Sequence, residues 1–233
     1  MQRIGFSEIP AILPVRPVIS ISGAGGKTTL LFRLAELFPG PVVLTTTTKV
    51  GAGQITAADQ LLSSGDFPPE KPGKVIWVSP SLIPANGKIS GFTEEGFTRP
   101  AAVCRSNGWP LIAETDGAAR RHLKAPAAHE PVIPAVCNVC FYLAGLDVIG
   151  KPLNEENVHR PEIFSRLTGL PMDAPVTPSS AAALMDHPEG GLKKMPEKAL
   201  RIAYFTHADN QERLSAGMQI SDKIKAYDYV MIG

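Results

Sequence analysis

A glycine-rich segment near the N-terminus carries residue types whose spacing suits phosphate chemistry. It lies between an apolar run and a segment whose leucines recur at helical spacing. Glycine lets backbone N–H groups curve around a phosphate, and the start of a helix adds the positive end of its dipole. We therefore expect a nucleotide phosphate to bind the residues of this segment, which are Gly23, Ala24, Gly25, Gly26, Lys27, Thr28 and Thr29.

Two side chains of this segment have separate expected roles. Lys27 would reach the β- and γ-phosphates as a catalytic group, and the Thr28 hydroxyl would ligate Mg²⁺. The pattern is the short G-x-x-G-K-T, because Ile21 stands where the usual phosphate-loop pattern begins with glycine. A similar short loop occurs in Mur-type ligases, so ATP and GTP both remain open as ligands. The alternative is a glycine-rich helix start with an exposed lysine.

Two acidic residues follow a later apolar run, Leu111–Glu114, in a pattern that resembles a Walker B strand. Glu114 and Asp116 stand two positions apart, so on an extended strand they share one face. We expect Asp116 to hold Mg²⁺ and Glu114 to orient an attacking water, both as catalytic groups. A run of threonines ends another strand, and from it we expect Thr48 to reach the metal. The alternatives are acids that cap a turn and the ordinary preference of threonine for strands.

The strand expected at 202–206 ends where guanine-binding NTPases carry the pattern N-K-x-D. Asp209 matches the aspartate that accepts hydrogen bonds from guanine, so we assign Asp209 to nucleotide binding. Thr206 and His207 replace the asparagine and the lysine of that pattern. A histidine can stack on a base, but guanine selectivity does not follow from these residues.

Three long segments interrupt the alternation of strands and helices, at about residues 80–98, 117–134 and 145–161. Loops of this length are usually functional, and in an open α/β sheet they lie at the carboxyl ends of the strands. The last two hold a local basic excess, which suits an anionic substrate or a client protein; the alternative is an ordinary solvated surface. We expect the substrate or partner to contact Lys124, His129, Lys151, His159 and Arg160.

The histidine and cysteine spacings do not predict a second metal site. The five histidines include no pair with spacing such as H-x-x-x-H. Cys137 and Cys140 form a C-x-x-C, but they fall in an apolar run at 136–144 that is typical of a buried strand. Residues three apart on a strand point to opposite faces, so we expect packing cysteines rather than a redox or metal pair.

Short apolar runs alternate with helical segments along the chain. Strands that are apolar throughout are typical of a parallel sheet that helices cover on both faces. We predict an α/β fold, P-loop NTPase-like, with a mostly parallel sheet, and residues 1–233 as a single domain with the three long loops. The expected strands are 18–22, 42–46, 75–78, 111–114, 136–144, 202–206 and 227–232, and the expected helices are 27–38 and 210–225.

Composition narrows the classes of partner. The net charge is +1, which argues against a general nucleic-acid binder because such proteins need a basic excess. The longest uncharged stretch, 131–146, is too short for a bilayer and contains two prolines. The N-terminus has no pattern of a secretory signal. We therefore expect a soluble, cytoplasmic protein without a nucleic-acid or membrane partner.

The chain resembles the YqeC-like family, whose members are described as selenium-dependent hydroxylase accessory proteins. The resemblance spans nearly the whole chain and rests on the phosphate-loop segment, the threonine run and Glu114-Thr115-Asp116-Gly117-Ala118. It also rests on H-E-P-V-I-P at 129–134, A-G-L-D at 144–147 and H-R-P-E at 159–162, which are not general phosphate-loop features. It implies a P-loop fold and a part in maturing selenium-dependent molybdenum hydroxylases, without naming a reaction.

Three functional hypotheses follow. The first is a nucleotide-binding NTPase, with Mg²⁺ and ATP or GTP, that assists a molybdenum hydroxylase client or a cofactor intermediate. The second is a small-molecule kinase or an ATP-dependent ligase that acts on an anionic acceptor. The third is a nucleotide-bound scaffold that does not hydrolyse its ligand. Fold class alone does not choose among them.

Overall fold

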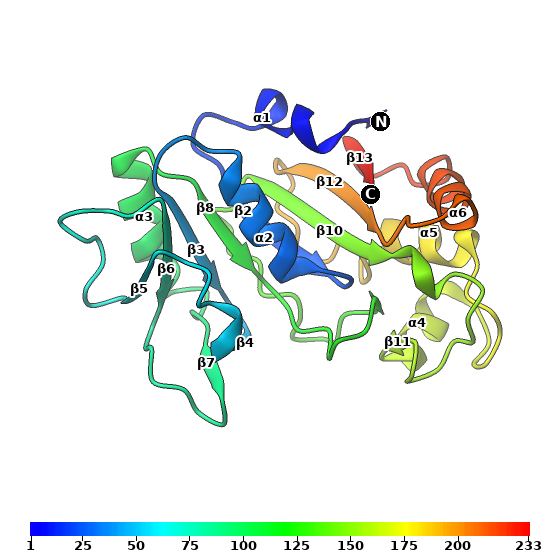
Figure 1. The fold of residues 1–233 in the computed structure, drawn as a ribbon. Coiled ribbons are helices and arrows are strands. Elements are labelled where there is room, and N and C mark those ends of the chain that lie inside the picture. The colour runs from blue at the N-terminus through cyan, green and yellow to red at the C-terminus, as the bar shows by residue number, and fades with distance from the viewer.

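The computed structural model describes residues 1–233 and contains one large parallel sheet (Figure 1). Every neighbouring pair of its nine strands is parallel. The strand order is β1 (Gln2–Arg3), β13 (Tyr229–Ile232), β12 (Leu200–Thr206), β10 (Val139–Gly145), β2 (Val18–Gly23), β8 (Leu111–Glu114), β3 (Val42–Thr46), β6 (Val75–Ser79) and β5 (Gln60–Ser63). The predicted α/β class and parallel sheet are confirmed, and the arrangement is P-loop NTPase-like.

Helices cover both faces of this sheet, as predicted. Apolar side chains of α1 (Ile9–Ile12) and α2 (Lys27–Glu36) pack in one core layer. The opposite layer receives α3 (Thr98–Asn107), α4 (Pro161–Thr168), α5 (Pro178–Asp186) and α6 (Gln211–Ser221). Successive strand residues alternate between the layers: Val43 packs in the second, while Val42 and Leu44 pack in the first. None of the helices combines the length and the apolar character that a membrane-spanning segment requires.

Two small sheets organise the long loops. β4 (Lys49–Gly51) pairs antiparallel with β7 (Lys88–Ser90), which brings the 80–98 segment beside the threonine run. β9 (Leu123–Lys124) pairs parallel with β11 (Val158–His159), which joins the 117–134 and 145–161 segments. Three short 3₁₀ turns complete the chain, at η1 (Phe6–Glu8), η2 (Ala52–Gln54) and η3 (Leu146–Val148).

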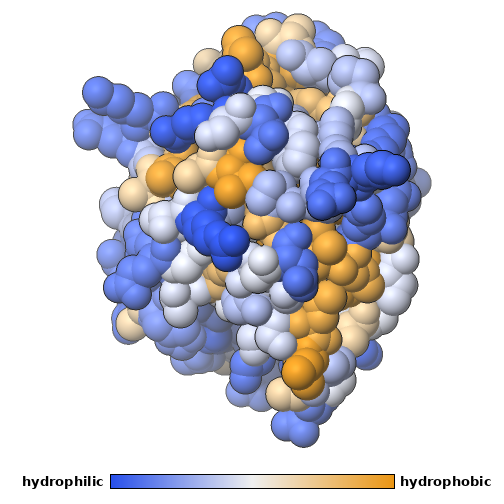
Figure 2. All heavy atoms as spheres, turned by 90° about the vertical axis from the view of Figure 1, so that its left-hand side faces the viewer, coloured by the Kyte–Doolittle hydropathy of each residue, from blue (hydrophilic) through white to orange (hydrophobic).

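The sheet ends at β5 on one side of the molecule. This strand is short, and its Leu61 is exposed. Figure 2 shows that this side is mostly hydrophilic, with separate apolar patches rather than one continuous apolar face. A short edge strand on a largely polar surface limits pairing with another chain.

The predicted cysteine geometry is wrong, although the predicted burial is right. The strand begins at Val139, not at 136, because the N–H of Cys137 donates to Pro134 O in a preceding turn. Cys137 and Cys140 therefore lie in the same core layer instead of on opposite faces. Burial raises the pKa of Cys140 to about 11 and that of Cys137 well above its usual value, so neither is a reactive thiolate.

Candidate functional site

The glycine-rich segment forms a tight loop between β2 and α2. Gly23, Gly25 and Gly26 all have positive φ, at 87°, 98° and 105°. A Cβ on Gly23 would lie 2.2 Å from the carbonyl oxygen of Leu143, and one on Gly25 would lie 2.7 Å from Thr206 Oγ1. Glycine is required at these positions because the loop lies directly against β10 and β12.

The loop is held at its start and open at the helix. The N–H of Gly23 donates to Asp116 Oδ2 at 3.1 Å, and the N–H of Ala24 donates to Leu143 O at 2.9 Å. The N–H groups of Gly26, Lys27 and Thr28 have no acceptor in the protein, and α2 has no side-chain N-cap. Free N–H groups at a helix start form a binding site for a phosphate.

Lys27 lies beneath this opening and is buried rather than exposed. Its Nζ donates to Gly23 O at 2.8 Å. The same Nζ lies 3.3 Å from Asp116 Oδ1 and 3.8 Å from Glu114 Oε1. The lysine therefore neutralises two carboxylates that the loop leaves little water to solvate.

The acidic pair lies together around Lys27, as its spacing predicts. Glu114 Oε2 accepts a hydrogen bond of 2.8 Å from the Thr28 hydroxyl. Burial raises the pKa of Glu114, although Lys27 and Thr28 act in the opposite direction. Asp116 Oδ1 is buried without a hydrogen-bond partner. These oxygens are the ligands that Mg²⁺ prefers, so the donor set fits a Mg²⁺–phosphate group.

The threonine run reaches the same edge. The hydroxyl of Thr46 donates to Glu114 O at 2.9 Å and accepts from the N–H of Thr48 at 3.0 Å. Thr48 and Asp116 both line a cavity of about 570 Å³, which continues toward the 117–134 segment. Its other polar lining residues include Thr47, Thr93, His129 and Glu130.

A chain of alternating charges leads from Lys27 to the long loops. Lys124 is buried, with its Nζ 3.0 Å from Asp116 Oδ2 and 2.8 Å from Glu130 Oε2. Arg160 donates to the same oxygen of Glu130. We call Lys27, Asp116, Lys124, Glu130 and Arg160 the charge chain.

Glu130 is the carboxylate that joins two cations of the charge chain. Burial alone would raise its pKa, but the hydrogen bonds from Arg160 and Lys124 outweigh burial and lower the pKa to about 2. Sequence reasoning missed Glu130, because only the fold shows which cation faces which acid.

The expected basic surface is therefore partly neutralised. Lys124 and Arg160 both form ion pairs with Glu130. The exposed His129 lies at the rim of the cavity, with its Nε2 3.9 Å from Glu130 Oε1. His159 pairs with Lys124 across β11 and β9; its pKa is lowered by burial and then by the charges of Arg160 and Lys124. Lys151 lies apart from this group, 3.6 Å from Asp147 Oδ2.

The end of β12 contacts the glycine-rich loop through Thr206. Its hydroxyl donates to Gly25 O at 2.7 Å, so this residue positions the phosphate loop. The His207 ring stacks on the ring of His122, at 4.3 Å between centroids. The exposed carboxylate of Asp209 accepts from Arg213 Nη1 at 2.8 Å within the first turn of α6.

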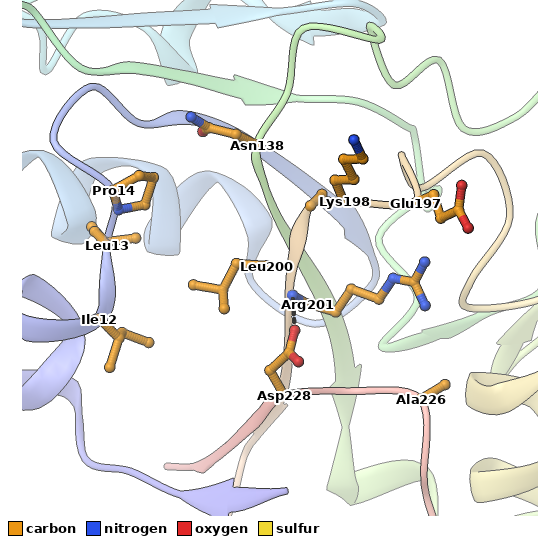
Figure 3. Close-up of a pocket in the computed structure, with 11 residues that line it drawn as sticks. Ile12, Leu13, Pro14, Asn138, Glu197, Lys198, Leu200, Arg201, Ala226 and Asp228 are labelled. Atoms are coloured by element: carbon orange, nitrogen blue, oxygen red, sulfur yellow. Dashed lines mark hydrogen bonds between the residues drawn. The ribbon is translucent and has the colours of Figure 1, made fainter.

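The opposite edge of the sheet holds a second cavity, of about 580 Å³ (Figure 3). It lies where β10, β12 and β13 begin. The N–H of Arg201 donates to Asp228 Oδ2 at 2.8 Å, and Asn138 Oδ1 accepts from the N–H of Val18. These contacts join the starts of neighbouring strands, and none of the residues expected to bind ligand lies here.

Comparisons with known proteins place the chain in a family. The family model described as YqeC protein matches residues 19–162, which include the glycine-rich loop, the acidic pair and the whole of both basic loops, 117–134 and 145–161. A protein of Escherichia coli (strain K12), described as "Uncharacterized protein YqeC", is 32% identical over an alignment 232 positions long. The alignment covers 91% of this chain and 84% of that protein. No solved structure matches the chain significantly. The chain belongs to the YqeC family.

Proposed function

We propose that this protein binds a Mg²⁺–nucleoside triphosphate, ATP or GTP, and hydrolyses its terminal phosphoanhydride bond. One observation carries the proposal: Lys27, Glu114 and Asp116 converge beside free backbone N–H groups. Buried charges of both signs beside an anion-binding helix start suit phosphoryl transfer, in which positioning and charge stabilisation supply most of the catalysis.

Each residue has a part that its present contacts allow. The N–H groups of the loop bind phosphate oxygens, and Lys27 exchanges Gly23 O for the β- and γ-phosphates. Thr28 and Asp116 would hold Mg²⁺, and Thr48 lines the cavity of about 570 Å³ together with Asp116. When bound, Mg²⁺ would neutralise charge that develops on the phosphate oxygens. Glu114 orients the attacking water, and burial raises its pKa, which makes its carboxylate a stronger proton acceptor.

The charge chain supports a link between the phosphate and the long loops. Asp116 contacts Lys27 through one oxygen and Lys124 through the other. When phosphate draws Lys27 away, Asp116 keeps Lys124 as its cationic partner. Lys124 in turn holds Glu130, which holds Arg160. We propose that hydrolysis is sensed along this route by a ligand at His129, His159 and Arg160.

The resemblance to the selenium-dependent hydroxylase accessory proteins supports a client. We propose that the ligand of the long loops is a selenium-dependent molybdenum hydroxylase or an intermediate of its cofactor, with Lys124 and Lys151 contributing charge. Asp209 remains our proposed contact for the nucleotide base, in exchange for Arg213.

A second candidate is a kinase or ligase that transfers the phosphoryl group to an anionic acceptor. The cavity of about 570 Å³ favours it, because Asp116 and His129 both line this space. An acceptor there would lie between the proposed metal group and the exposed histidine.

Phosphate release under multiple turnover tests the proposal. We expect wild-type protein with Mg²⁺ and ATP or GTP to release phosphate without an added acceptor, and Glu114→Gln to lose at least 10-fold in rate while it still binds nucleotide. Release only after an anionic acceptor is added would favour the kinase or ligase. Tight nucleotide binding without any release would favour the scaffold.

A further inference from the structure

Three side chains from distant parts of the chain converge beside the phosphate loop. His122 precedes β9, Asp147 lies in η3 and His207 follows β12. His122 Nδ1 lies 3.0 Å from both carboxylate oxygens of Asp147. The two imidazole rings stack nearly parallel, with 9° between their planes, so one ring must turn out of the stack before both nitrogens face the same metal. One nitrogen or oxygen from each residue lies within 4.8 Å of those of the other two.

We propose that His122, Asp147 and His207 form a binding site for a divalent transition metal of the zinc and cobalt class. Imidazole nitrogen is a ligand for such metals, whereas Mg²⁺ prefers oxygen. Two histidines and one carboxylate are a known zinc ligand set, and three protein ligands leave a further position for water or another donor. This site is separate from the oxygen ligands around Lys27.

The backbone holds the three residues in place. Gly145 N donates to His122 O at 2.6 Å, and a Cβ on Gly145 would lie 2.6 Å from His122 Cβ. His207 has a φ of 62°, which is uncommon outside glycine and persists where neighbouring contacts fix the chain. The preceding residue, Thr206, is bonded to the phosphate loop at Gly25. Asp147 and His207 thus follow the ends of β10 and β12, and the hydrogen bond from Gly145 ties His122 to the end of β10.

The site is open to solvent, and a metal that enters passes Arg120 and Arg121 as well as Glu156, which line the same entrance. The side chain of His122 is 40% exposed, and a cavity of about 200 Å³ reaches His122 and Asp147. Lys151 Nζ lies 3.6 Å from Asp147 Oδ2, so this ammonium group would compete with a metal for the carboxylate. Its side chain is half exposed and can turn toward solvent when a metal takes the carboxylate.

The experiment titrates nucleotide-free protein with Co²⁺ and follows visible absorption, in excess Mg²⁺ so that oxygen-only sites are filled. Zn²⁺ competition then gives the affinity. We expect one equivalent of Co²⁺ to bind, and His122→Ala, His207→Ala and Asp147→Asn each to weaken binding at least 10-fold. His187→Ala is the matched control, because His187 lies outside this cluster and its Nδ1 accepts from the N–H of Glu189. The control is expected to bind like wild type.

Circular dichroism first establishes that each variant is folded, and His207→Gln replaces His207→Ala if that variant is not. Lys27→Ala is expected to keep wild-type Co²⁺ binding, so this result does not depend on the proposed nucleotide function. Wild-type protein without saturable Co²⁺ binding would overturn the metal site. Wild-type affinity in the folded His207 variant would overturn it equally.

Discussion

The two edges of the central sheet hold cavities of nearly equal size but different construction. At the carboxyl edge, buried charges of Lys27, Asp116 and Lys124 pair with one another beneath free backbone N–H groups. At the amino edge, Arg201 and Asp228 join strand starts, and Asp228 lies at the surface. Cavity volume does not separate the two edges, whereas the chemistry of the buried groups does.

The difference shows how a ligand site is kept ready in a folded chain. Charges at the carboxyl edge are paired internally, so the protein avoids unpaired buried ions before any ligand arrives. The same pairs can be exchanged for phosphate and metal. At the amino edge the hydrogen bonds hold the strands together, and a ligand could replace them only by loosening the sheet.

Apart from the loss of Lys27 itself, the largest effect is expected at Asp116, the carboxylate that Lys27 and Lys124 share. Asp116→Asn removes one metal ligand and one partner of both lysines. We expect nucleotide affinity in Mg²⁺ to fall about 100-fold, or roughly 3 kcal/mol. In EDTA the loss should be smaller, because the metal contact no longer contributes and only the contacts of Asp116 with Gly23 N and the two lysines change. Calorimetry in both buffers measures the two losses, and equal losses would make Asp116 a structural residue.

A second change tests the close approach of the loop to β12. Gly25→Ala places a methyl group 2.7 Å from Thr206 Oγ1 at a φ of 98°. We expect about 2 kcal/mol of lost stability, together with weaker nucleotide binding. Gly40→Ala is the control, since a Cβ there meets nothing within 4 Å. Chemical denaturation that gives both variants the same stability would show that the loop tolerates the shift.

A third change tests how much the ion pairs of the charge chain contribute to folding stability at low pH. The pKa of Glu130 is lowered in the folded protein to about 2, from an ordinary value of 4.5. The unfolded chain therefore binds the proton more readily, and wild-type stability should fall as pH drops from about 4.5 toward 2. We expect Glu130→Gln to remove about 1–2 kcal/mol of this pH dependence. Urea unfolding across that range is the measurement; an unchanged slope would mean that the ion pairs contribute little.

The smallest expected effect lies at the amino edge. Asp228→Asn weakens one hydrogen bond to Arg201 N and should cost about 1 kcal/mol or less in stability. Nucleotide affinity should change less than twofold. A larger loss of affinity would mean that the two edges are coupled through the sheet.

The sequence predicts the central strands well because they are short apolar runs between clear turn signals. It does not predict α3, α4 and α5. In α3 only Pro100, Ala101 and Cys104 are buried, so helical periodicity is weak. The glycine-rich loop and the acidic pair are local patterns, and the structure brings Lys27, Glu114 and Asp116 together. Glu130, His122 and Asp147 escape prediction because their partners come from distant strand ends, which only the fold brings together.

Nucleotide affinity of Lys27→Ala, measured beside Asp228→Asn and wild type, tests the central claim most directly. Isothermal titration with Mg²⁺–ATP and Mg²⁺–GTP is run on each protein after circular dichroism establishes folding. We expect wild type and Asp228→Asn to bind one of the two nucleotides with the same affinity, and Lys27→Ala to lose at least 100-fold. Undiminished binding by folded Lys27→Ala, or no binding of either nucleotide by wild type, would contradict a phosphate site at the carboxyl edge.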